Sequence, residues 1–571
     1  MNSEFSTLAP GMSRRDFLQR ASAAALAASA IPEHALAKRM SSEEVSTHTL
    51  WDLAQNSKDI LTLTVWFTAQ DVNKFLSHVD GMEDAISWCK QNGITKVSLE
   101  AFGRGLYANR QTLLGAKTRF LREGFAVRGG VLTTKFGKNG FGDDWNAQCY
   151  TDRTTQEELQ RIFEYAASIF DEIIIDDWYF TECQCAECIA ACGDESWSKY
   201  YRDLMVRMSR DRVMKPAHAI NPNVKVIIKF PQWYDEFHRR GYDVAREPGI
   251  FDGIWVGTES RNFEYLNGPG YEIGYNAYFN MRWLGGLGSV GGGWFDSERT
   301  TVEAFVEQAR HTVLGGGKEI ILWCYGHMLE ETESTGSIKG TPIVNMKALK
   351  KELPGLIRLA GIVQGQPIRG IHLLKPPNSE PFEEEWVCSF LGCLGLPFVP
   401  AHEIDELAQS ALFPVQVLRD AAFPDALRRM LDKGASIVIT DGLDKRLTSH
   451  AEIPDDPKLT VLHVGKSPRQ LLQLTREELK PIRDKLLAPL EVRFDAPNKV
   501  ELYLFGQNSF VVVNINDKEV EVTLELVHIS DAHKALVLPE DQGSVELSQS
   551  GNSMKIRLSP RTLVAVEYHV S

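Results

Sequence analysis

Between residues 59 and about 330, short apolar runs alternate with longer segments in which apolar residues recur every three or four positions. Runs of the first kind are typical of strands buried on both faces, and the longer segments of amphipathic helices. The alternation predicts a parallel sheet with helices between its strands. The predicted strands are Leu61–Phe67, Lys96–Ala101, Ala126–Thr133, Glu172–Asp177, Lys225–Phe230, Gly253–Gly257, Ser289–Phe295 and Glu319–Cys324. The predicted helices include Met82–Gln91, Thr112–Glu123, Gln156–Ile169, Ser198–Arg212 and Val302–Leu314.

Eight such strands within about 270 residues fit the size of a (β/α)8 TIM barrel, which we place at residues 38–350. Residues 351–485 contain two more strand-like runs, Gly370–Leu374 and Ala435–Thr440, with helical segments between them. They predict a small α/β domain of the doubly wound, flavodoxin-like type. Neither run leads into a G-x-G-x-x-G or P-loop sequence, so nothing indicates a nucleotide site.

The pattern changes again in residues 486–571, where apolar and polar residues alternate in short runs separated by turn residues. Alternation with a period of two is typical of strands with one buried face, and several such strands predict an antiparallel β-sandwich. The runs are Glu501–Phe505, Ser509–Ile515, Glu519–Leu526, Ser544–Leu547 and Thr562–Tyr568. The fold class expected for the whole chain is therefore α/β, with a barrel, a flavodoxin-like domain and a C-terminal sandwich.

Composition supports a multidomain globular protein. The chain has 571 residues, 43% hydrophobic and 24% charged, which is too long for a single core. The formal net charge is −14, and no basic run is present, so we expect no nucleic-acid partner. No run reaches the roughly 20 apolar residues of a membrane span.

The N-terminal residues resemble a twin-arginine export signal, which we place at residues 1–37. Ser13-Arg14-Arg15-Asp16-Phe17-Leu18 precedes the small-residue apolar stretch Ala21–Ile31, and Ala35-Leu36-Ala37 fits a cleavage site. The sequence therefore predicts a periplasmic or secreted protein that begins near Lys38.

The fourth predicted strand carries the most informative chemistry. Its sequence, EIIIDDWYFTEC, ends in Asp176 and Asp177, followed by three aromatic residues. Substrates of barrel enzymes bind at the carboxyl ends of the strands, and a carboxylate beside aromatic rings suits sugars. The alternative is that one aspartate caps a helix and the other forms a salt bridge. We interpret the site as that of a glycoside hydrolase acting on a carbohydrate.

The ends of the other strands add cations, carboxylates and tryptophans. A retaining glycosidase needs two carboxyl groups, a nucleophile and an acid/base. We assign these roles to Asp177 and Glu259, with Asp296 as the alternative second carboxylate. Lys229 is expected to keep Asp177 ionised. The predicted substrate-binding residues are Trp66, Glu100, Arg104, Asp176, Trp178, Lys229, Trp233, Arg261, Trp294 and Trp323.

Three alternatives remain open at this point. Glu259 can instead form an ion pair with Arg261 or Arg282. Lys229 can instead have a lowered pKa and form Schiff bases, as in class I aldolases. The whole protein can also be a catalytically inactive carbohydrate-binding or scaffold protein.

Four cysteines, Cys183, Cys185, Cys188 and Cys192, follow the fourth strand. Thiolates at this density fit structural zinc, and after export they equally fit two short disulfides. Cys89, Cys149, Cys324, Cys388 and Cys393 are scattered and are expected in the core. No cofactor for catalysis is expected.

The order of domains resembles that of family 42 glycoside hydrolases, the bacterial β-galactosidases, which also bind zinc through a cysteine cluster near the active site. This resemblance implies a homotrimer or homodimer formed through the small α/β domain. The residues depart from that family, which has Asn-Glu after strand four and glutamate after strand seven. Here Asp176-Asp177 and Trp294-Phe295-Asp296 stand there. By strand position, Asp177 and Glu259 are instead similar to the catalytic pair of retaining α-glycosidases of the α-galactosidase and α-glucosidase superfamily.

Overall fold

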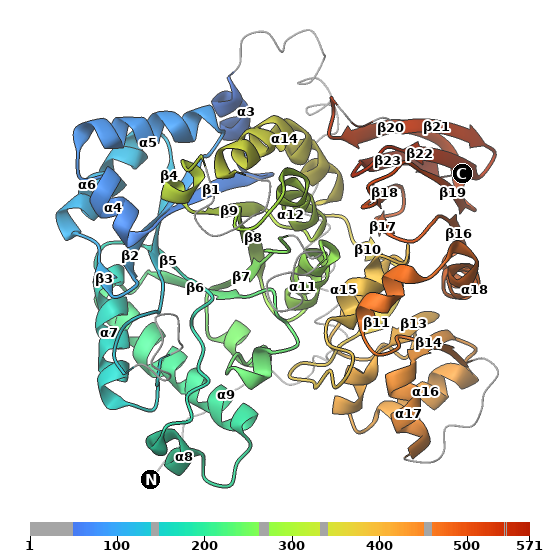
Figure 1. Cartoon of the computed structure of the whole chain (residues 1–571), viewed down its shortest axis with the longest axis horizontal. Coiled ribbons are helices and arrows are strands. Elements are labelled where there is room, and N and C mark those ends of the chain that lie inside the picture. Colours follow the sequence, from blue (N-terminus) through green and yellow to red (C-terminus); the bar gives the residue numbers. More distant parts are fainter. Residues whose placement is uncertain are drawn as a thin grey trace, which may run out of the picture. The chain divides into compact units, whose positions relative to one another are not determined.

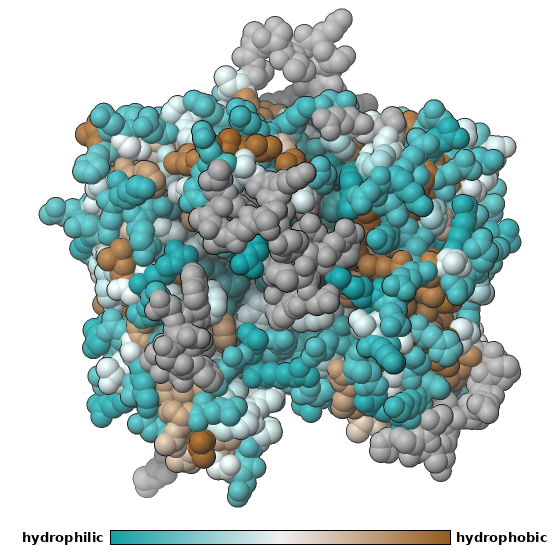
Figure 2. Space-filling view, in the orientation of Figure 1, coloured by the Kyte–Doolittle hydropathy of each residue, from teal (hydrophilic) through white to brown (hydrophobic). Residues whose placement is uncertain are grey.

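The computed structural model describes residues 49–138, 148–261, 273–331, 341–449, 459–541, 543 and 545–570. The predicted export signal lies outside these residues. Among the described helices, none combines the length and apolar character needed to cross a membrane. Hydrophilic residues predominate on the face shown in Figure 2, and apolar residues form only scattered patches there.

The first part of the chain forms a closed parallel barrel, coloured blue to yellow-green in Figure 1. Strand β1 pairs with both β2 and β9, which closes the sheet, and a short strand β3 (Leu106–Tyr107) folds back onto β2. All eight predicted strands and the TIM barrel are confirmed. The barrel strands are β1 Thr62–Phe67, β2 Lys96–Gly103, β4 Ala126–Val131, β5 Glu172–Ile175, β6 Lys225–Phe230, β7 Gly253–Gly257, β8 Val290–Asp296 and β9 Glu319–Trp323.

Helices cover the outside of the barrel and begin at side-chain caps. The side chains of Asn109, Asp152 and Thr301 each accept a backbone N–H from the first turn of the helix that follows. The predicted segments are helical, with α9 continuing through a π-helical turn, Ser209–Met214, into α10 (Lys215–Ile220). The helices are α5 Val79–Gln91, α6 Arg110–Arg122, α7 Arg153–Ala167, α9 Trp197–Met208, α11 Tyr275–Gly285, α12 Val302–Leu314 and α14 Pro342–Val363.

Glycines make room for tryptophan rings inside the barrel. A Cβ atom on Gly130 would lie 2.2 Å from the ring of Trp66, and one on Gly291 would lie 2.2 Å from the ring of Trp255. Trp66 and Trp294 are buried there, with ring centroids 4.5 Å apart. Closely packed tryptophan rings therefore fill the barrel below the strand ends.

The second part of the chain is a five-stranded parallel sheet with helices. Its strands in chain order are β11 Ile371–Leu374, β12 Phe398–Ala401, β13 Ser410–Phe413, β14 Ser436–Thr440 and β15 Leu459–Leu462. They lie in the order β12-β11-β13-β14-β15, which is the flavodoxin-like order 2-1-3-4-5. The predicted fold is confirmed, but three of its strands had no clear signal in the sequence.

The carboxyl ends of β13 and β14, where such sheets commonly bind ligands, are capped by the chain itself. The carboxylate of Glu384 accepts hydrogen bonds from the backbone nitrogens of Val415 and Gly442 and from the hydroxyl of Thr440, at 2.8 to 3.0 Å. This carboxylate lies where a ligand anion would otherwise bind.

The C-terminal part consists of two antiparallel sheets, as predicted for a sandwich. One sheet has the order β10-β17-β18-β23-β20, and the other β16-β19-β22-β21. The first includes Ile368–Arg369 (β10), which precedes the α/β domain, so the chain crosses between the two parts there. The remaining strands are β16 Val492–Asp495, β17 Val500–Phe505, β18 Ser509–Asn514, β19 Val520–Leu526, β20 Ile529–Leu538, β21 Val545–Ser550, β22 Ser553–Leu558 and β23 Leu563–Val570.

Candidate active site

A cavity of about 780 Å³ lies at the carboxyl ends of the barrel strands. It brings together residues that are up to 262 positions apart in the sequence, from Thr68 after β1 to Glu330 after β9. Eleven of the thirteen predicted site residues line this cavity, namely Arg104, Asp176, Asp177, Trp178, Lys229, Trp233, Glu259, Arg261, Trp294, Asp296 and Trp323.

The side chain of Lys229 is the centre of this arrangement. It projects from β6, is 2% exposed, and its ammonium nitrogen contacts three carboxyl groups. Glu259 Oε1 lies 2.6 Å away, Asp177 Oδ2 3.0 Å and Asp176 Oδ1 3.5 Å. The same nitrogen lies 4.3 Å from the centre of the Trp294 ring. One buried cation therefore contacts the carboxyl groups that follow β5 and β7.

The two adjacent aspartates have opposite pKa shifts. Burial and the neighbouring charge of Asp177 raise the pKa of Asp176 well above its ordinary value. Burial also acts to raise the pKa of Asp177, but the charge of Lys229 and hydrogen bonds from Asp176 and Lys229 outweigh it, so the pKa of Asp177 is lowered. Asp177 is thus the ionised member of the pair.

The pKa of Glu259 is shifted in the opposite direction from that of Asp177. Burial, with the charges of Asp177 and Asp296, raises its pKa to about 7 despite the contact with Lys229. Two carboxyl groups on one ammonium therefore differ in protonation near neutral pH. Such a difference is what an acid and a nucleophile in one site require.

Lys229 itself stays charged. Burial acts to lower the pKa of its ammonium group, but Asp177, Glu259 and Asp176 together raise it above its ordinary value. A Schiff base forms from a neutral amine, so three carboxyl groups around the ammonium disfavour the aldolase interpretation of this site.

Arg261 and Asp296 form a second ion pair beside the first. The Nε and Nη2 atoms of Arg261 donate to Oδ1 and Oδ2 of Asp296 at 3.1 and 2.6 Å, which is a bidentate geometry. Arg261 is thus paired with Asp296, whereas the closest cation to Glu259 is Lys229. Arg282 donates to the backbone oxygen of Leu314 at 2.7 Å.

Two arginines at the cavity have left-handed backbone conformations. The φ angles of Arg104 and Arg261 are +54° and +50°, and the ring of Trp323 lies 5.4 Å from the Arg104 guanidinium. Non-glycine residues in this region are strained, and such residues concentrate at functional sites.

Comparison with known proteins agrees with this geometry. Residues 48–352 match the family described as a probable glycosyl hydrolase, catalytic domain, and this match covers more than half of the chain. The chain belongs to this glycosyl hydrolase family. The matched residues contain the whole barrel and every residue that lines the cavity.

Two similarities extend beyond the barrel of this glycosyl hydrolase. An uncharacterized protein of Saccharolobus solfataricus is 24% identical over 414 residues, which are 66% of this chain and 65% of that protein, less than two thirds of its length. A β-galactosidase of the Antarctic haloarchaeon Halorubrum lacusprofundi superposes with a TM-score of 0.55 at 11% identity, over 90% of this chain and 99% of that one. The second similarity shows that the fold is shared along nearly the whole chain.

A weaker similarity is to the exo-carrageenase GH42 of Bacteroides ovatus. Its TM-score is 0.48 at 9% identity, over 84% of this chain and 81% of that one.

Two predicted substrate-binding residues do not line the cavity. Trp66 is fully buried inside the barrel, where the rings of Trp294 and Trp323 cover it. Glu100 is also fully buried, its Oε2 bound to the backbone nitrogen of Ala69, and burial raises its pKa to about 8. The structure thus places both side chains inside the barrel and outside the cavity lining.

Several residues that line the cavity were not predicted from the sequence. Phe180 and Glu182 lie within the segment EIIIDDWYFTEC and could have been included on the same argument. Arg240 and Glu330 belong to longer loops with no such signal. Asp71 also lines the cavity, but it completes the capping box of helix α4 (Ala69–Phe75).

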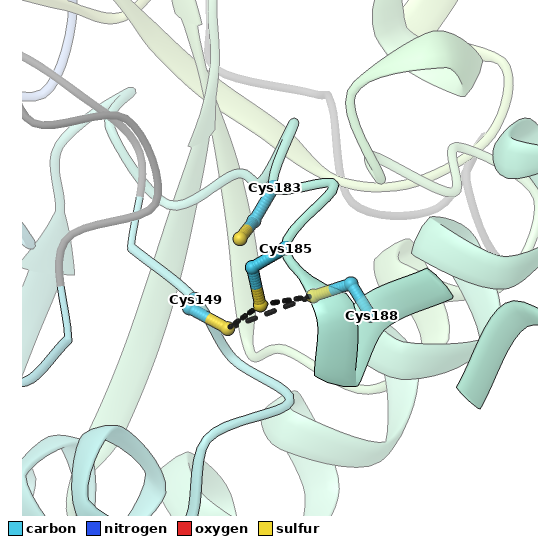
Figure 3. Close-up of side chains that lie close together, drawn as sticks. All are labelled: Cys149, Cys183, Cys185 and Cys188. Carbon is cyan, nitrogen blue, oxygen red and sulfur yellow. Dashed lines mark hydrogen bonds between the residues drawn. The ribbon is translucent and has the colours of Figure 1, made fainter. Parts of the chain in front are cut away.

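The cysteine cluster found in the structure differs from the predicted set in one member. Cys149, Cys183, Cys185 and Cys188 come together, with all four sulfur atoms within 4.8 Å of one another (Figure 3). Cys192 lies outside this group and its sulfur contacts the backbone oxygen of Glu195. The spacing of the motif suggested Cys192 as the fourth ligand. The structure has Cys149 in its place, which lies 34 positions before Cys183 in the sequence.

None of the nine cysteines is in a disulfide. In the cluster, the Cys149–Cys185, Cys149–Cys188 and Cys185–Cys188 sulfur separations are 3.8, 3.6 and 3.7 Å. Zinc bound tetrahedrally to sulfur at about 2.3 Å requires sulfur separations of about 3.8 Å. The donor set therefore fits zinc in both atom type and spacing.

Proposed function

We propose that this protein is a retaining glycoside hydrolase in which Asp177 is the nucleophile and Glu259 is the acid/base. The observation that carries this proposal is the shared contact of both carboxyl groups with Lys229, at 3.0 and 2.6 Å. Two oxygens at these distances from one nitrogen are at most about 5.6 Å apart, which is compatible with the roughly 5 to 5.5 Å of retaining enzymes. Inverting enzymes hold their carboxyl groups about 6.5 to 9.5 Å apart.

The contacts suggest how protons are distributed before reaction. Lys229 donates to Glu259 Oε1, so the proton of neutral Glu259 resides on Oε2. Asp177 Oδ2 is ionised and bound by the same ammonium. In the first step Asp177 attacks the anomeric carbon while Glu259 Oε2 gives its proton to the leaving oxygen. In the second step Glu259 takes a proton from water, which then displaces Asp177.

Asp296 is a less suitable acid than Glu259. Both of its oxygens accept hydrogen bonds from Arg261, and Oδ1 also accepts one from the backbone nitrogen of Glu298. Both oxygens are therefore already occupied as hydrogen-bond acceptors, whereas Glu259 Oε2 has no hydrogen-bond partner among the described residues. We propose that the Arg261–Asp296 pair binds hydroxyl groups of the sugar.

The proposal is tested by a screen of 4-nitrophenyl α- and β-glycosides, with the anomer of the first product followed by proton NMR. Retention of configuration is expected. Azide should then restore turnover to Asp177→Ala and yield a glycosyl azide of inverted configuration. With Glu259→Ala and an activated substrate, azide should yield the retained configuration. Asp296→Asn serves as the matched control, since azide should not rescue it. Release of the opposite anomer by the wild-type protein would exclude the assigned mechanism.

We further propose that Cys149, Cys183, Cys185 and Cys188 hold a structural zinc ion. Four thiolates complete a tetrahedral shell, so such an ion supplies no catalytic water and its contribution is to fix the loop after Asp177. The sulfur separations given above support this proposal.

Export through the twin-arginine route remains a proposal from the sequence. A fusion of residues 1–40 to a reporter tests it, because replacement of Arg14 and Arg15 by lysine should abolish export.

A further inference from the structure

We infer that the loops after β5 and β6 form a second sugar-binding site, which holds the leaving group next to Glu259. The inference rests on the proposed function and adds the class of substrate, a disaccharide or oligosaccharide. Five side chains make this site, which we call the leaving-group wall: Trp178, Phe180, Glu182, Trp233 and Arg240.

The wall is an aromatic surface with polar groups at its edge. The rings of Trp178 and Phe180 are stacked with centroids 5.5 Å apart, and Phe180 meets Trp233 edge to face at 5.4 Å. Phe180 and Trp233 are buried, whereas Trp178 is partly exposed. The two buried rings therefore back the partly exposed one. A sugar ring stacks its C–H face on such a surface.

Arg240 and Glu182 supply the polar edge. The guanidinium of Arg240 lies 4.6 Å from the Trp233 ring and 5.5 Å from the Phe180 ring. Its Nε atom lies 2.8 Å from Glu182 Oε1. The side chain of Glu182 is 40% exposed, so its carboxylate can accept hydrogen bonds from hydroxyl groups while it remains paired with Arg240.

The acid of the site faces the same loops. A Cβ atom on Gly257 would lie 2.5 Å from Glu259 Oε2 and 2.8 Å from the backbone nitrogen of Gln232. Glu259 Oε2, which carries the proton to be transferred, therefore lies next to Gly257, and so does the start of the loop after β6. An acid protonates the leaving oxygen, so the leaving group belongs on the side of Glu259 where that loop lies.

Gln232 adds an unsatisfied acceptor at this place. Its side chain lines the cavity and is 5% exposed, and Oε1 has no hydrogen-bond partner among the residues that the structure describes. Buried polar atoms normally have a partner. A hydroxyl group of the leaving sugar would supply one.

The two loops are joined before any ligand arrives. The backbone nitrogen of Thr181 donates to the backbone oxygen of Arg240 at 3.1 Å, and the hydroxyl of Tyr242 donates to the backbone oxygen of Asp177 at 2.6 Å. The wall is thus fixed relative to the nucleophile, which lowers the cost of binding a second sugar.

The part of the cavity lined by β8 and β9 is more deeply buried than the leaving-group wall. Trp294 and Trp323, on β8 and β9, are stacked with centroids 5.8 Å apart, and Trp294 is 1% exposed. This deeper surface suits the sugar that is attacked. The more exposed wall suits the sugar that departs.

The test compares two substrates of the sugar that the nitrophenyl screen identifies. One is its glycosyl fluoride, whose leaving group needs neither a proton nor a stacking surface, and the other is that sugar linked to glucose. For Trp178→Ala, the ratio of kcat/KM for the disaccharide to kcat/KM for the fluoride should fall about tenfold or more, because only the disaccharide has a leaving group that packs on this ring. Glu182→Gln, at an exposed position, should lower the same ratio by a smaller factor.

Trp51→Ala is the matched control, because Trp51 is also partly buried and packs on Phe125 away from the cavity. It should leave the ratio unchanged. An unchanged ratio in both Trp178→Ala and Glu182→Gln would overturn the inference, as would a wild-type protein that cleaves the fluoride but none of the glucose-linked disaccharides. Failure of the wild-type protein to cleave any glycoside would instead overturn the proposed function.

Discussion

Lys229 determines how the carboxyl groups around it are ionised. Its ammonium group holds Asp177 ionised, while burial keeps Glu259 protonated up to a pH of about 7. The sequence predicted this group of residues because each lies within two residues of the end of a barrel strand. It could not tell that Trp66 and Glu100 belong to the layer below, since a strand alternates its faces and only the register between strands fixes the height of each residue.

Loss of the proton of Glu259 should limit the reaction at high pH. The pKa of this group is raised, so its active, protonated form is present below a pH of about 7 and is lost as the pH rises through that value. We expect kcat/KM to fall above pH 7 in the wild-type protein. Glu259→Gln should lose about 10²- to 10⁴-fold in activity and show no such basic limb. Glu330→Gln, also at the cavity, should keep the limb, and a basic limb that survives in Glu259→Gln would contradict the assignment.

Removal of the Lys229 charge should change the acidic limb. The ammonium lowers the pKa of Asp177, so in Lys229→Met this pKa should rise and Asp177 should become protonated at a higher pH. The acidic limb of kcat/KM should therefore move to higher pH, with a loss of about 10²- to 10³-fold in rate. Lys229→Arg, which keeps the charge, should move the limb less. An acidic limb at the same pH in Lys229→Met would show that Lys229 does not tune the nucleophile.

Strands and loops set the positions of these side chains. The eight apolar runs of the barrel gave signals in the sequence, whereas the four-residue strands β12, β13 and β15 did not, because runs this short are hard to distinguish from loop or helix segments. The cysteine motif predicted a metal site in the right loop. Cys149 was not predicted because contacts between distant segments leave no local spacing pattern.

A larger side chain at Gly291 of β8 should destabilise the barrel. A Cβ atom there would lie 2.2 Å from the ring of Trp255, and overpacking of this kind costs about 1–3 kcal/mol. We expect Gly291→Ala to lower the free energy of unfolding by that amount in urea titration. Gly361→Ala is the control, because no atom lies within 4 Å of a Cβ at this helical position. Equal stability of both variants would mean that the ring has room to move.

The cysteine cluster allows a matched pair of variants. Cys149→Ser removes one of the four sulfur ligands, so we expect it to lose bound zinc, as measured by mass spectrometry of the metal content, and to unfold at a lower temperature. Cys192→Ser should keep about one zinc ion per chain, because the Cys192 sulfur lies outside the cluster. Loss of zinc from Cys192→Ser but not from Cys149→Ser would instead support the four ligands predicted from the motif.

At the scale of the whole molecule, buried polar contacts join the barrel to the other parts of the chain. His311 of α12 lies 2.8 Å from Glu501 of β17, and both are fully buried. The hydroxyl of Tyr503 also donates to Glu501 at 2.7 Å. On the other side, the indole nitrogen of Trp283 donates to the backbone oxygen of Lys375, at the end of β11. The order of domains was predictable, but these junctions were not, because single buried pairs leave no periodic pattern.

The His311–Glu501 pair should make stability depend on pH. Burial acts to lower the pKa of His311, but Glu501 and Glu307 outweigh it and raise the pKa above its ordinary value. A raised pKa means that the stabilisation is present below a pH of about 6.5 and is lost as the pH rises through the value in the folded protein. Between pH 6 and about 9 the wild-type protein should therefore lose more thermal stability than His311→Gln. Parallel losses in the two proteins would show that this pair does not couple folding to pH.

The central claim is that Asp177 forms a covalent bond to the sugar, and trapping that intermediate tests it most directly. The protein would be incubated with activated 2-deoxy-2-fluoro glycosides of the sugar found in the screen, digested with trypsin, and sequenced by tandem mass spectrometry. The account predicts one fluoroglycosyl group on Asp177, within the peptide of residues 162–199 that follows Arg161 and ends at Lys199. A group attached to Asp176, Glu259 or Asp296 would contradict it.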